Sequence, residues 1–239
     1  MSRDHALAGL VEAGTGVLRF YRWIRPTISF GRNEPSEGLF DTEAAVRAGY
    51  DFVRRPTGGR AVLHDEELTY SAIVPVRALG GARKTCSLFG EALASGLRSL
   101  GAPAELVPDG GSVPPLTAGP CFAAPGPGEI VAEGRKLVGS AQARIGGALL
   151  QHGSIPIAGD QNALPFALGR RALEGVGHTT LRTLIGEIDP GEAASALTRS
   201  FREKLGGSWC EGRFSQVELK RAGELRQGRY GSSAWTWRR

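Results

Sequence analysis

Residues 121–155 read CFAAPGPGEIVAEGRKLVGSAQARIGGALLQHGSI, and the rest of the chain is best understood outward from them. Glu129–Ala132 and Lys136–Arg144 flank a Glu-Gly pair and are predicted to form a β-hairpin. Gly147–Pro156 is predicted to return as one more strand. Cys121 precedes these strands in a loop that several prolines interrupt. We therefore expect the remaining chain to be scaffold around this segment.

Strand and helix patterns divide the chain unequally. The predicted strands before this segment are Val17–Arg22, Thr27–Phe30, Phe52–Arg55, Ala61–His64, Glu67–Val76 and Ala104–Val107. The predicted helices are Asp4–Glu12, Asp41–Ala48, Thr85–Leu100, Thr180–Ile185, Gly191–Leu205 and Ser215–Gly228. Strands dominate the first 155 residues and do not alternate regularly with helices. The order predicts an α+β fold, a mostly antiparallel sheet with helices packed on it.

Composition indicates a folded protein of 239 residues, with 41% hydrophobic and 22% charged residues. The net charge of +5 fits either a mildly basic surface or attraction to an acidic protein partner. Lysines and arginines are scattered without interleaved aromatics, so nucleic-acid binding is not expected. No signal peptide and no membrane-spanning apolar run are found. The three cysteines lack CxxC spacing, which predicts reduced thiols in the cytoplasm and no metal site.

Cys121 and Lys136 are the first residues that could carry chemistry. A buried cysteine is usually a small apolar residue, but Cys121 lies in an irregular loop, where functional groups concentrate. Lys136 could point to solvent from its strand, or its ammonium could point into a cleft. There it would stabilise a nearby thiolate or take up a proton from an attacking amine. The small residues of Gly139–Gln142 would let a substrate approach the backbone.

The loop after the strand at 52–55 is the second candidate element. It reads Arg54-Arg55-Pro56-Thr57-Gly58-Gly59-Arg60, and its glycines permit positive φ and close backbone approach. Its N–H groups could cradle phosphate or carbonyl oxygens, or it could be a tight hairpin with solvated arginines. His64 and His152 complete the set, and spacing alone assigns neither a proton-transfer role.

Three segments carry a resemblance to a known superfamily. They are RRPTGGRAVLHDEELTYS (54–71), GRKLVGSAQAR (134–144) and LQHGSI (150–155). Together they resemble the lipoate ligase, octanoyltransferase and biotin ligase superfamily, over nearly the whole chain. The pattern Cys121-Phe122, Pro125, Glu129 and Gly134-Arg135-Lys136 is most similar to LipM-type octanoyltransferases. The resemblance implies one catalytic domain over residues 1–239, with the biotin/lipoate protein ligase fold, which is class II synthetase-like.

The resemblance also implies an activity and its residues. Octanoate would pass from the phosphopantetheine of acyl carrier protein through a Cys121 thioester to a lysine of a lipoyl-domain protein, such as the glycine-cleavage H protein. Lys136 would assist the thiol, and no cofactor beyond the octanoyl-phosphopantetheine substrate is expected. The residues that would line or position the acyl pocket are Arg55, Thr57, Gly58, Gly59, His64, Ser140 and His152. The protein is expected to be a monomer, with no membrane partner.

Other activities on the same fold stay open at this point. An ATP-dependent lipoate or octanoate ligase would usually continue His-Asp-x-Gly-Asn, whereas this chain reads His64-Asp65-Glu66-Glu67-Leu68. The biotin-ligase signature GRGRxG is absent. An amidotransferase between two lipoyl domains would also use a cysteine, and a non-catalytic binding module would use none. Family members usually carry a strand before the Met-x-x-Asp-x-Ala-Leu segment, which begins here at Met1, so this sequence is expected to lack that edge strand.

Overall fold

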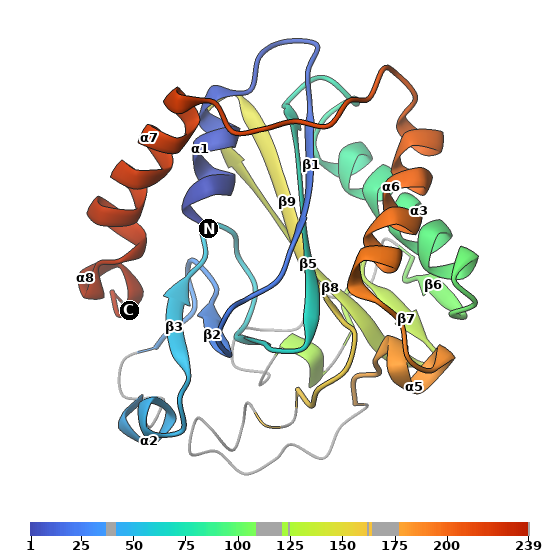
Figure 1. The fold of residues 1–239 in the computed structure, drawn as a ribbon, viewed down its shortest axis with the longest axis horizontal. Coiled ribbons are helices and arrows are strands. Elements are labelled where there is room, and N and C mark those ends of the chain that lie inside the picture. The colour runs from blue at the N-terminus through green and yellow to red at the C-terminus, as the bar shows by residue number, and fades with distance from the viewer. Residues whose placement is uncertain (37–41, 109–120, 124, 162, 164–176, 239) are drawn as a thin grey trace.

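We describe the fold from a computed structural model (Figure 1). It describes residues 1–36, 42–108, 121–123, 125–161, 163 and 177–238. Residues 109–120, which include most of the glycine- and proline-rich stretch 108–119 that the sequence predicts to be a loop, and residues 164–176 lie outside the described residues. Within the described residues, no helix has the length and apolar character needed to cross a membrane.

The larger of two sheets forms the centre of the described structure. Its strands run in the order β1-β5-β9-β8-β7-β6, and every neighbouring pair is antiparallel. Their bounds are β1 Val17–Tyr21, β5 Glu67–Pro75, β6 Ala104–Leu106, β7 Ile130–Ala132, β8 Arg135–Ile145 and β9 Ala148–Pro156. The predicted hairpin and return strand are therefore β7, β8 and β9, side by side (Figure 1).

The smaller sheet corrects one expectation. It has the order β3-β2-β4, with β2 Thr27–Phe30 between β3 Asp51–Arg54 and β4 Val62–His64. β3 is parallel to β2, and β4 is antiparallel to it. The loop 55–61 is thus no hairpin turn, because it crosses the end of β2 from one edge strand to the other. Its arginines are not solvated either, since Arg54, Arg55 and Arg60 are all buried.

Helices cover the larger sheet on both faces (Figure 1). Their bounds are α1 Ser2–Leu10, α2 Thr42–Arg47, α3 Ala82–Ser99, α5 Leu181–Ile185, α6 Pro190–Leu205, α7 Gln216–Leu225 and α8 Ser233–Thr236. Sequence signals mark their starts: Asp189 caps α6 ahead of Pro190, and Ser215 with Glu218 forms a capping box on α7. The predicted α+β class with a mostly antiparallel sheet is confirmed.

Alternation along β5 sends its side chains to two different environments. Leu68, Tyr70 and Ala72 join the main core with α3 and α6. On α3, Phe89, Leu93 and Leu97 are fully buried, and each contributes about 1.5–3 kcal/mol of transfer free energy. The opposite face is apolar only near α1, where Ile73 packs. Towards the start of β5 that face becomes polar at Thr69, beside a cavity.

The C-terminal residues hold the small sheet in place. Trp237 packs on Phe30 and Phe52, with ring centroids 5.4 and 5.1 Å away. Arg54 Nε donates to Thr236 O at 2.9 Å, and Trp235 Nε1 donates to Arg54 O at 2.9 Å. The end of the chain therefore anchors the strand from which the 55–61 loop departs.

Candidate active site

Cys121 lies between the residue that precedes β4 of the smaller sheet and Lys136 on β8 of the larger sheet. It begins a 3-10 turn, Cys121–Ala123, and its N–H donates to Ala61 O at 2.9 Å. Phe122 is buried and anchors the turn, which leaves Cys121 half-buried at a cavity wall. The loop that the sequence predicted is thus a 3-10 turn at Cys121. Its backbone is hydrogen-bonded to Ala61, the last residue of the 55–61 loop.

Lys136 does not point to solvent, although a lysine in a strand usually does. Its side chain is completely buried, and its Nζ donates to Cys121 Sγ at 3.2 Å and to Cys121 O at 2.9 Å. The Nζ also lies 2.6 Å from Glu129 Oε1. The structure therefore brings together the two residues that the sequence pattern singled out, 15 positions apart.

Glu129 is a residue to which sequence reasoning assigned no role. Its Oε2 accepts the Gly126 N–H at 2.6 Å while Oε1 binds the Lys136 ammonium. Glu129 directly precedes β7, and the pairing of β7 with β8 is irregular just after it, where the register shifts between Ile130 and Val131. Such a bulge changes the direction of neighbouring side chains. The one available signal was a carboxylate seven residues before the lysine.

The 55–61 loop is folded around the side chain of its first residue, Arg55. Arg55 Nη2 donates to Gly58 O at 3.1 Å and Arg60 O at 2.8 Å, so the guanidinium closes the loop from inside. Gly59 has φ +90°, which glycine adopts without strain. Gly31 must also be glycine, because a Cβ there would lie 1.7 Å from Gly59 O.

Deep in the site, His64 belongs to a buried polar network that the sequence did not predict. Arg55 Nη1 donates to Ser29 Oγ at 2.7 Å, and Ser29 Oγ lies 2.6 Å from His64 Nε2. His64 Nδ1 lies 2.8 Å from Glu67 Oε1. Glu67 also accepts the hydroxyls of Thr69 and Ser154. Because the Ser29 hydroxyl accepts from Arg55, its hydrogen can go to Nε2, which leaves Nδ1–H to donate to Glu67.

His152 and Ser140 line the same space with different constraints. His152 Nε2 lies 2.6 Å from Thr57 Oγ1, and burial lowers the pKa of His152 to about 3. The ring is therefore neutral at pH 7, and its Nδ1 has no hydrogen-bond partner among the described residues. Ser140 Oγ lies 2.7 Å from Tyr70 OH, which fixes the hydroxyl at the wall.

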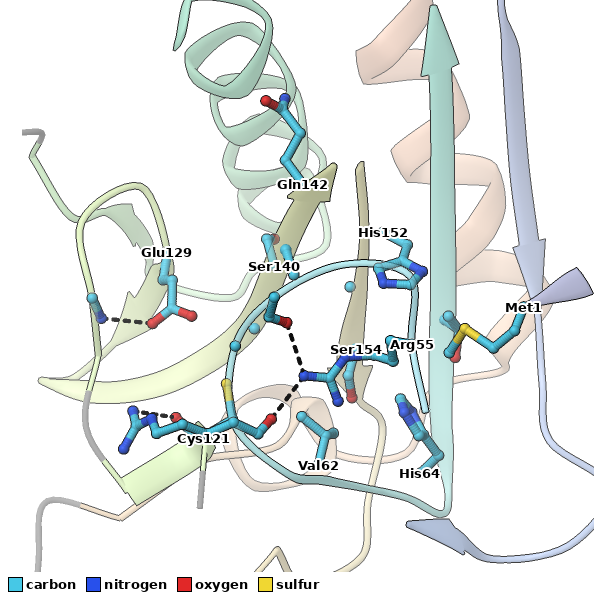
Figure 2. Close-up of a pocket in the computed structure, with 18 of the residues that line it drawn as sticks. Met1, Arg55, Val62, His64, Cys121, Glu129, Ser140, Gln142, His152 and Ser154 are labelled. Carbon is cyan, nitrogen blue, oxygen red and sulfur yellow. Dashed lines mark hydrogen bonds between the residues drawn. The ribbon is translucent and has the colours of Figure 1, made fainter. Parts of the chain in front are cut away.

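A cavity of about 490 Å³ connects these groups, a volume typical of small-molecule sites. Figure 2 shows Cys121 and Glu129 towards one side of it and His64 and His152 towards the other. The predicted residues in its lining are Arg55, Gly58, Gly59, His64, Cys121, Ser140 and His152. Thr57 and Lys136 are not in the lining, and each instead holds a residue that is. Lining residues that the sequence did not predict include Val62, Thr69, Gly126, Glu129 and Ser154.

Metal binding has no structural support in the described part of the chain. No group of three or more histidine, cysteine, aspartate or glutamate residues is placed there to hold an ion. The acidic side chains at the cavity instead contact other side chains, Glu129 as an ion pair with Lys136 and Glu67 through a hydrogen bond with His64. The arrangement that can do chemistry is the Cys121 thiol beside the Lys136 ammonium, at one side of the cavity.

Comparison with known proteins identifies the family. Residues 1–202 match the model of the lipoyl protein ligase A/B catalytic domain. Octanoyltransferase LipM of Moorella thermoacetica is 39% identical over 239 residues, which cover 93% of this chain and 86% of the relative. Octanoyltransferase LipM of Symbiobacterium thermophilum is 36% identical over 262 residues, which cover 100% and 93%.

Among solved structures, a lipoate-protein ligase A bound with ATP superposes with a TM-score of 0.83. It is 25% identical, and the match covers 99% of this chain and 92% of the ligase. The predicted resemblance is therefore confirmed both in sequence and in fold. The chain belongs to the lipoyl protein ligase A/B catalytic domain family and, within it, to the LipM octanoyltransferases.

Proposed function

We propose that the chain carries an octanoyl group on the sulfur of Cys121. The group would come from the phosphopantetheine thioester of acyl carrier protein and pass to a lysine ε-amine of a lipoyl-domain protein. One observation carries the proposal: the buried Lys136 Nζ lies 3.2 Å from Cys121 Sγ at the wall of the cavity. A cysteine thiolate is the nucleophile in thioester exchange, and a neighbouring cation stabilises it.

In the first step, the Cys121 thiolate attacks the carbonyl carbon of the donor thioester. A new C–S bond forms to Cys121, and the pantetheine sulfur leaves with the electron pair of the broken bond. That thiolate then takes the proton that Cys121 gave up. The Lys136 ammonium is placed to stabilise the attacking sulfur, because it donates directly to it.

In the second step, the acceptor amine attacks the same carbonyl carbon. The C–N bond forms, the bond to Cys121 breaks, and one proton of the amine ends on the departing sulfur. Exchange between two thioesters is close to neutral in free energy, and formation of the amide is downhill. ATP is therefore unnecessary, which separates this chemistry from that of a ligase.

The cavity fits the acyl chain in this scheme. Arg55, His64 and His152 line it, and both Nη atoms of Arg55, both ring nitrogens of His64 and Nε2 of His152 are hydrogen-bonded within the protein. A wall whose polar groups are already hydrogen-bonded within the protein presents less penalty to an alkyl chain. We infer that octanoyl extends from Cys121 towards His64.

Intact-mass analysis with octanoyl-acyl carrier protein tests the proposal. The wild-type chain should gain one octanoyl group, and hydroxylamine should remove it, as expected of a thioester. Cys121→Ala should gain none. Cys210→Ala is the matched control, because Cys210 is an exposed cysteine outside the site, and it should acylate like wild type.

The same samples then receive a lipoyl domain without ATP. Transfer of octanoyl from the acylated wild type to the domain completes the expected result. A wild-type chain that never acylates would overturn the proposal. So would a Cys121→Ala variant that modifies the domain from free octanoate and ATP, since that outcome indicates a ligase.

A further inference from the structure

The Lys136 Nζ donates to three acceptors, and only one of them is a carboxylate. Cys121 O at 2.9 Å is a neutral carbonyl, and Cys121 Sγ at 3.2 Å is charged only as a thiolate. Glu129 Oε1 at 2.6 Å is the third acceptor. Among the residues that the structure describes, Glu129 supplies the carboxylate within ion-pair distance of Nζ.

Because the Lys136 side chain is buried, the Glu129 carboxylate affects whether that side chain carries a charge. Lys136 is completely buried, and removing an ammonium from water favours the neutral amine unless a counter-charge is present. A neutral amine would offer no positive charge to a sulfur anion. Glu129 therefore supports the form of Lys136 that the chemistry uses.

The carboxylate is held in place before any substrate arrives. Its second oxygen accepts the Gly126 N–H at 2.6 Å, and its own backbone carbonyl accepts the Val107 N–H at 2.8 Å. Glu129 directly precedes β7, where the register with β8 shifts between Ile130 and Val131. Glu129 thus meets the geometric requirement for a positioning residue, which is a fixed rotamer and satisfied hydrogen bonds.

The need for this carboxylate changes during the reaction. In the enzyme before acylation, the Cys121 thiolate is itself an anion next to Lys136. In the acyl-enzyme, the sulfur is part of a neutral thioester, so Glu129 is the remaining ionic partner. We infer that Glu129 keeps Lys136 in its ammonium form in the acyl-enzyme, and so acts mainly on transfer to the amine rather than on acylation. This inference rests on the proposed function.

Single-turnover measurements separate the two steps. The acylation rate is the rate at which the enzyme gains octanoyl from the carrier protein. The transfer rate is the rate at which pre-acylated enzyme loses octanoyl to a lipoyl domain. For Glu129→Gln, we expect acylation within about threefold of wild type and transfer slowed by about ten- to a hundredfold, the scale of losing a hydrogen bond to a charge. The amide keeps the shape and an acceptor for Gly126 N–H.

Two further variants control the result. Glu133→Gln changes a glutamate of the same hairpin that pairs with the partly exposed Arg135, and both of its rates should match wild type. Glu129→Asp keeps the charge on a shorter side chain, so its transfer rate should lie between those of wild type and Glu129→Gln. If Glu129→Gln unfolds, the ratio of the two rates in Glu129→Asp gives the same test.

The outcomes distinguish this inference from the proposal beneath it. Equal slowing of both steps would indicate a purely structural role and would overturn the inference, as would an unchanged transfer rate. A wild-type enzyme without octanoyl on Cys121 would instead overturn the proposed function. The wild-type mass measurement answers that question before any variant is compared.

Discussion

The two sides of the cavity neutralise buried charge in different ways. The sulfur end consists of Cys121, Glu129 and Lys136, and its three contacts all meet at one nitrogen. The histidine end links Arg55 through Ser29 and His64 to Glu67, so its opposite charges are separated by two neutral groups. Figure 2 shows Cys121 and His64 on different sides of the space.

This difference indicates which property of the protein a substitution at each end should affect. At the sulfur end, one acceptor is the group that reacts, so the charge balance there must alter during each turnover. At the histidine end, every link is between groups that need not change, and all four residues are buried. We therefore expect substitutions at the sulfur end to appear in rates and those at the histidine end to appear in stability.

The largest effect is expected from Lys136→Met, which keeps the length of the side chain and removes the charge. Octanoyl transfer should fall by about a hundred- to ten-thousandfold, the range of a positioned proton-transfer or charge-stabilising group. The measurement is the steady-state rate of lipoyl-domain modification. Lys84→Met is the control at an exposed lysine. If Lys136→Met retained most of the activity, the sulfur end would not be the reacting side.

Next in size is Glu67→Gln at the histidine end. The carboxylate accepts from His64, Thr69 and Ser154, and an amide nitrogen cannot accept any of them. The free energy of unfolding in urea should fall by about 2–4 kcal/mol, as for a broken buried network.

Glu66→Gln provides the comparison for this stability measurement. Glu66 is the neighbouring residue, its side chain is half exposed, and it lies 3.9 Å from Arg182. Its unfolding free energy should stay within about 0.5 kcal/mol of wild type. Equal losses in both variants would show that the histidine end is no more sensitive than the surface.

The sequence predicted the elements of both ends better than their contacts. The alternation in 67–76 and the spacing of apolar residues in 85–100 are local patterns, and β5 and α3 confirm them. The pairing of β3 with β2 is not local, and for that reason the loop at 55–61 was wrongly open to a hairpin interpretation. Whether an arginine in that loop is solvated depends on which strands surround it.

The site shows the same limit at the level of single side chains. The direction of Lys136 follows from strand register, and Glu129 lies just before an irregularity in the pairing of β7 with β8, so neither direction could be read from spacing. Glu67 was noted only because it departs from the ligase pattern, while His64 and Ser154, which bind its carboxylate, come from β4 and β9. Loop context and motif resemblance together identified Cys121, and the contacts around it required the structure.

A smaller effect is expected from His152, which lies on the same side of the cavity as His64 (Figure 2). Its folded-state pKa of about 3 lies below the ordinary 6.5. Above pH 6.5 the His152 side chain is neutral in both the folded and the unfolded protein. As the pH falls towards 3, this side chain gains a proton only in the unfolded protein. Stability is therefore lost with acidification, by at most about 1.4 kcal/mol per pH unit from this one group.

His152→Gln removes this titration. The free energy of unfolding, measured in urea at pH 6.5 and at pH 4.5, should decline less in the variant than in wild type. Other groups contribute equally to both proteins, including His5, whose pKa burial lowers to about 4. Identical declines would mean that His152 is not held neutral in the folded protein.

The smallest effect is expected in the loop that joins the two ends. Arg55 belongs to the histidine end, and Arg60 Nη2 reaches Cys121 O at 3.3 Å, so the glycines between them set the spacing of the ends. Gly59→Ala places a side chain at φ +90° and 3.3 Å from Arg55 Nη2. We expect unfolding to become easier by about 1–2 kcal/mol.

Gly58→Ala is the matched substitution, because a Cβ there meets no atom within 4 Å and its φ is not in the left-handed region. It should leave the unfolding free energy within about 0.5 kcal/mol, since a surface-like change without strain costs little. The contrast between adjacent glycines isolates backbone conformation from the loss of glycine as such. If both variants lost the same stability, the loop would be limited by space in the cavity rather than by the turn at Gly59.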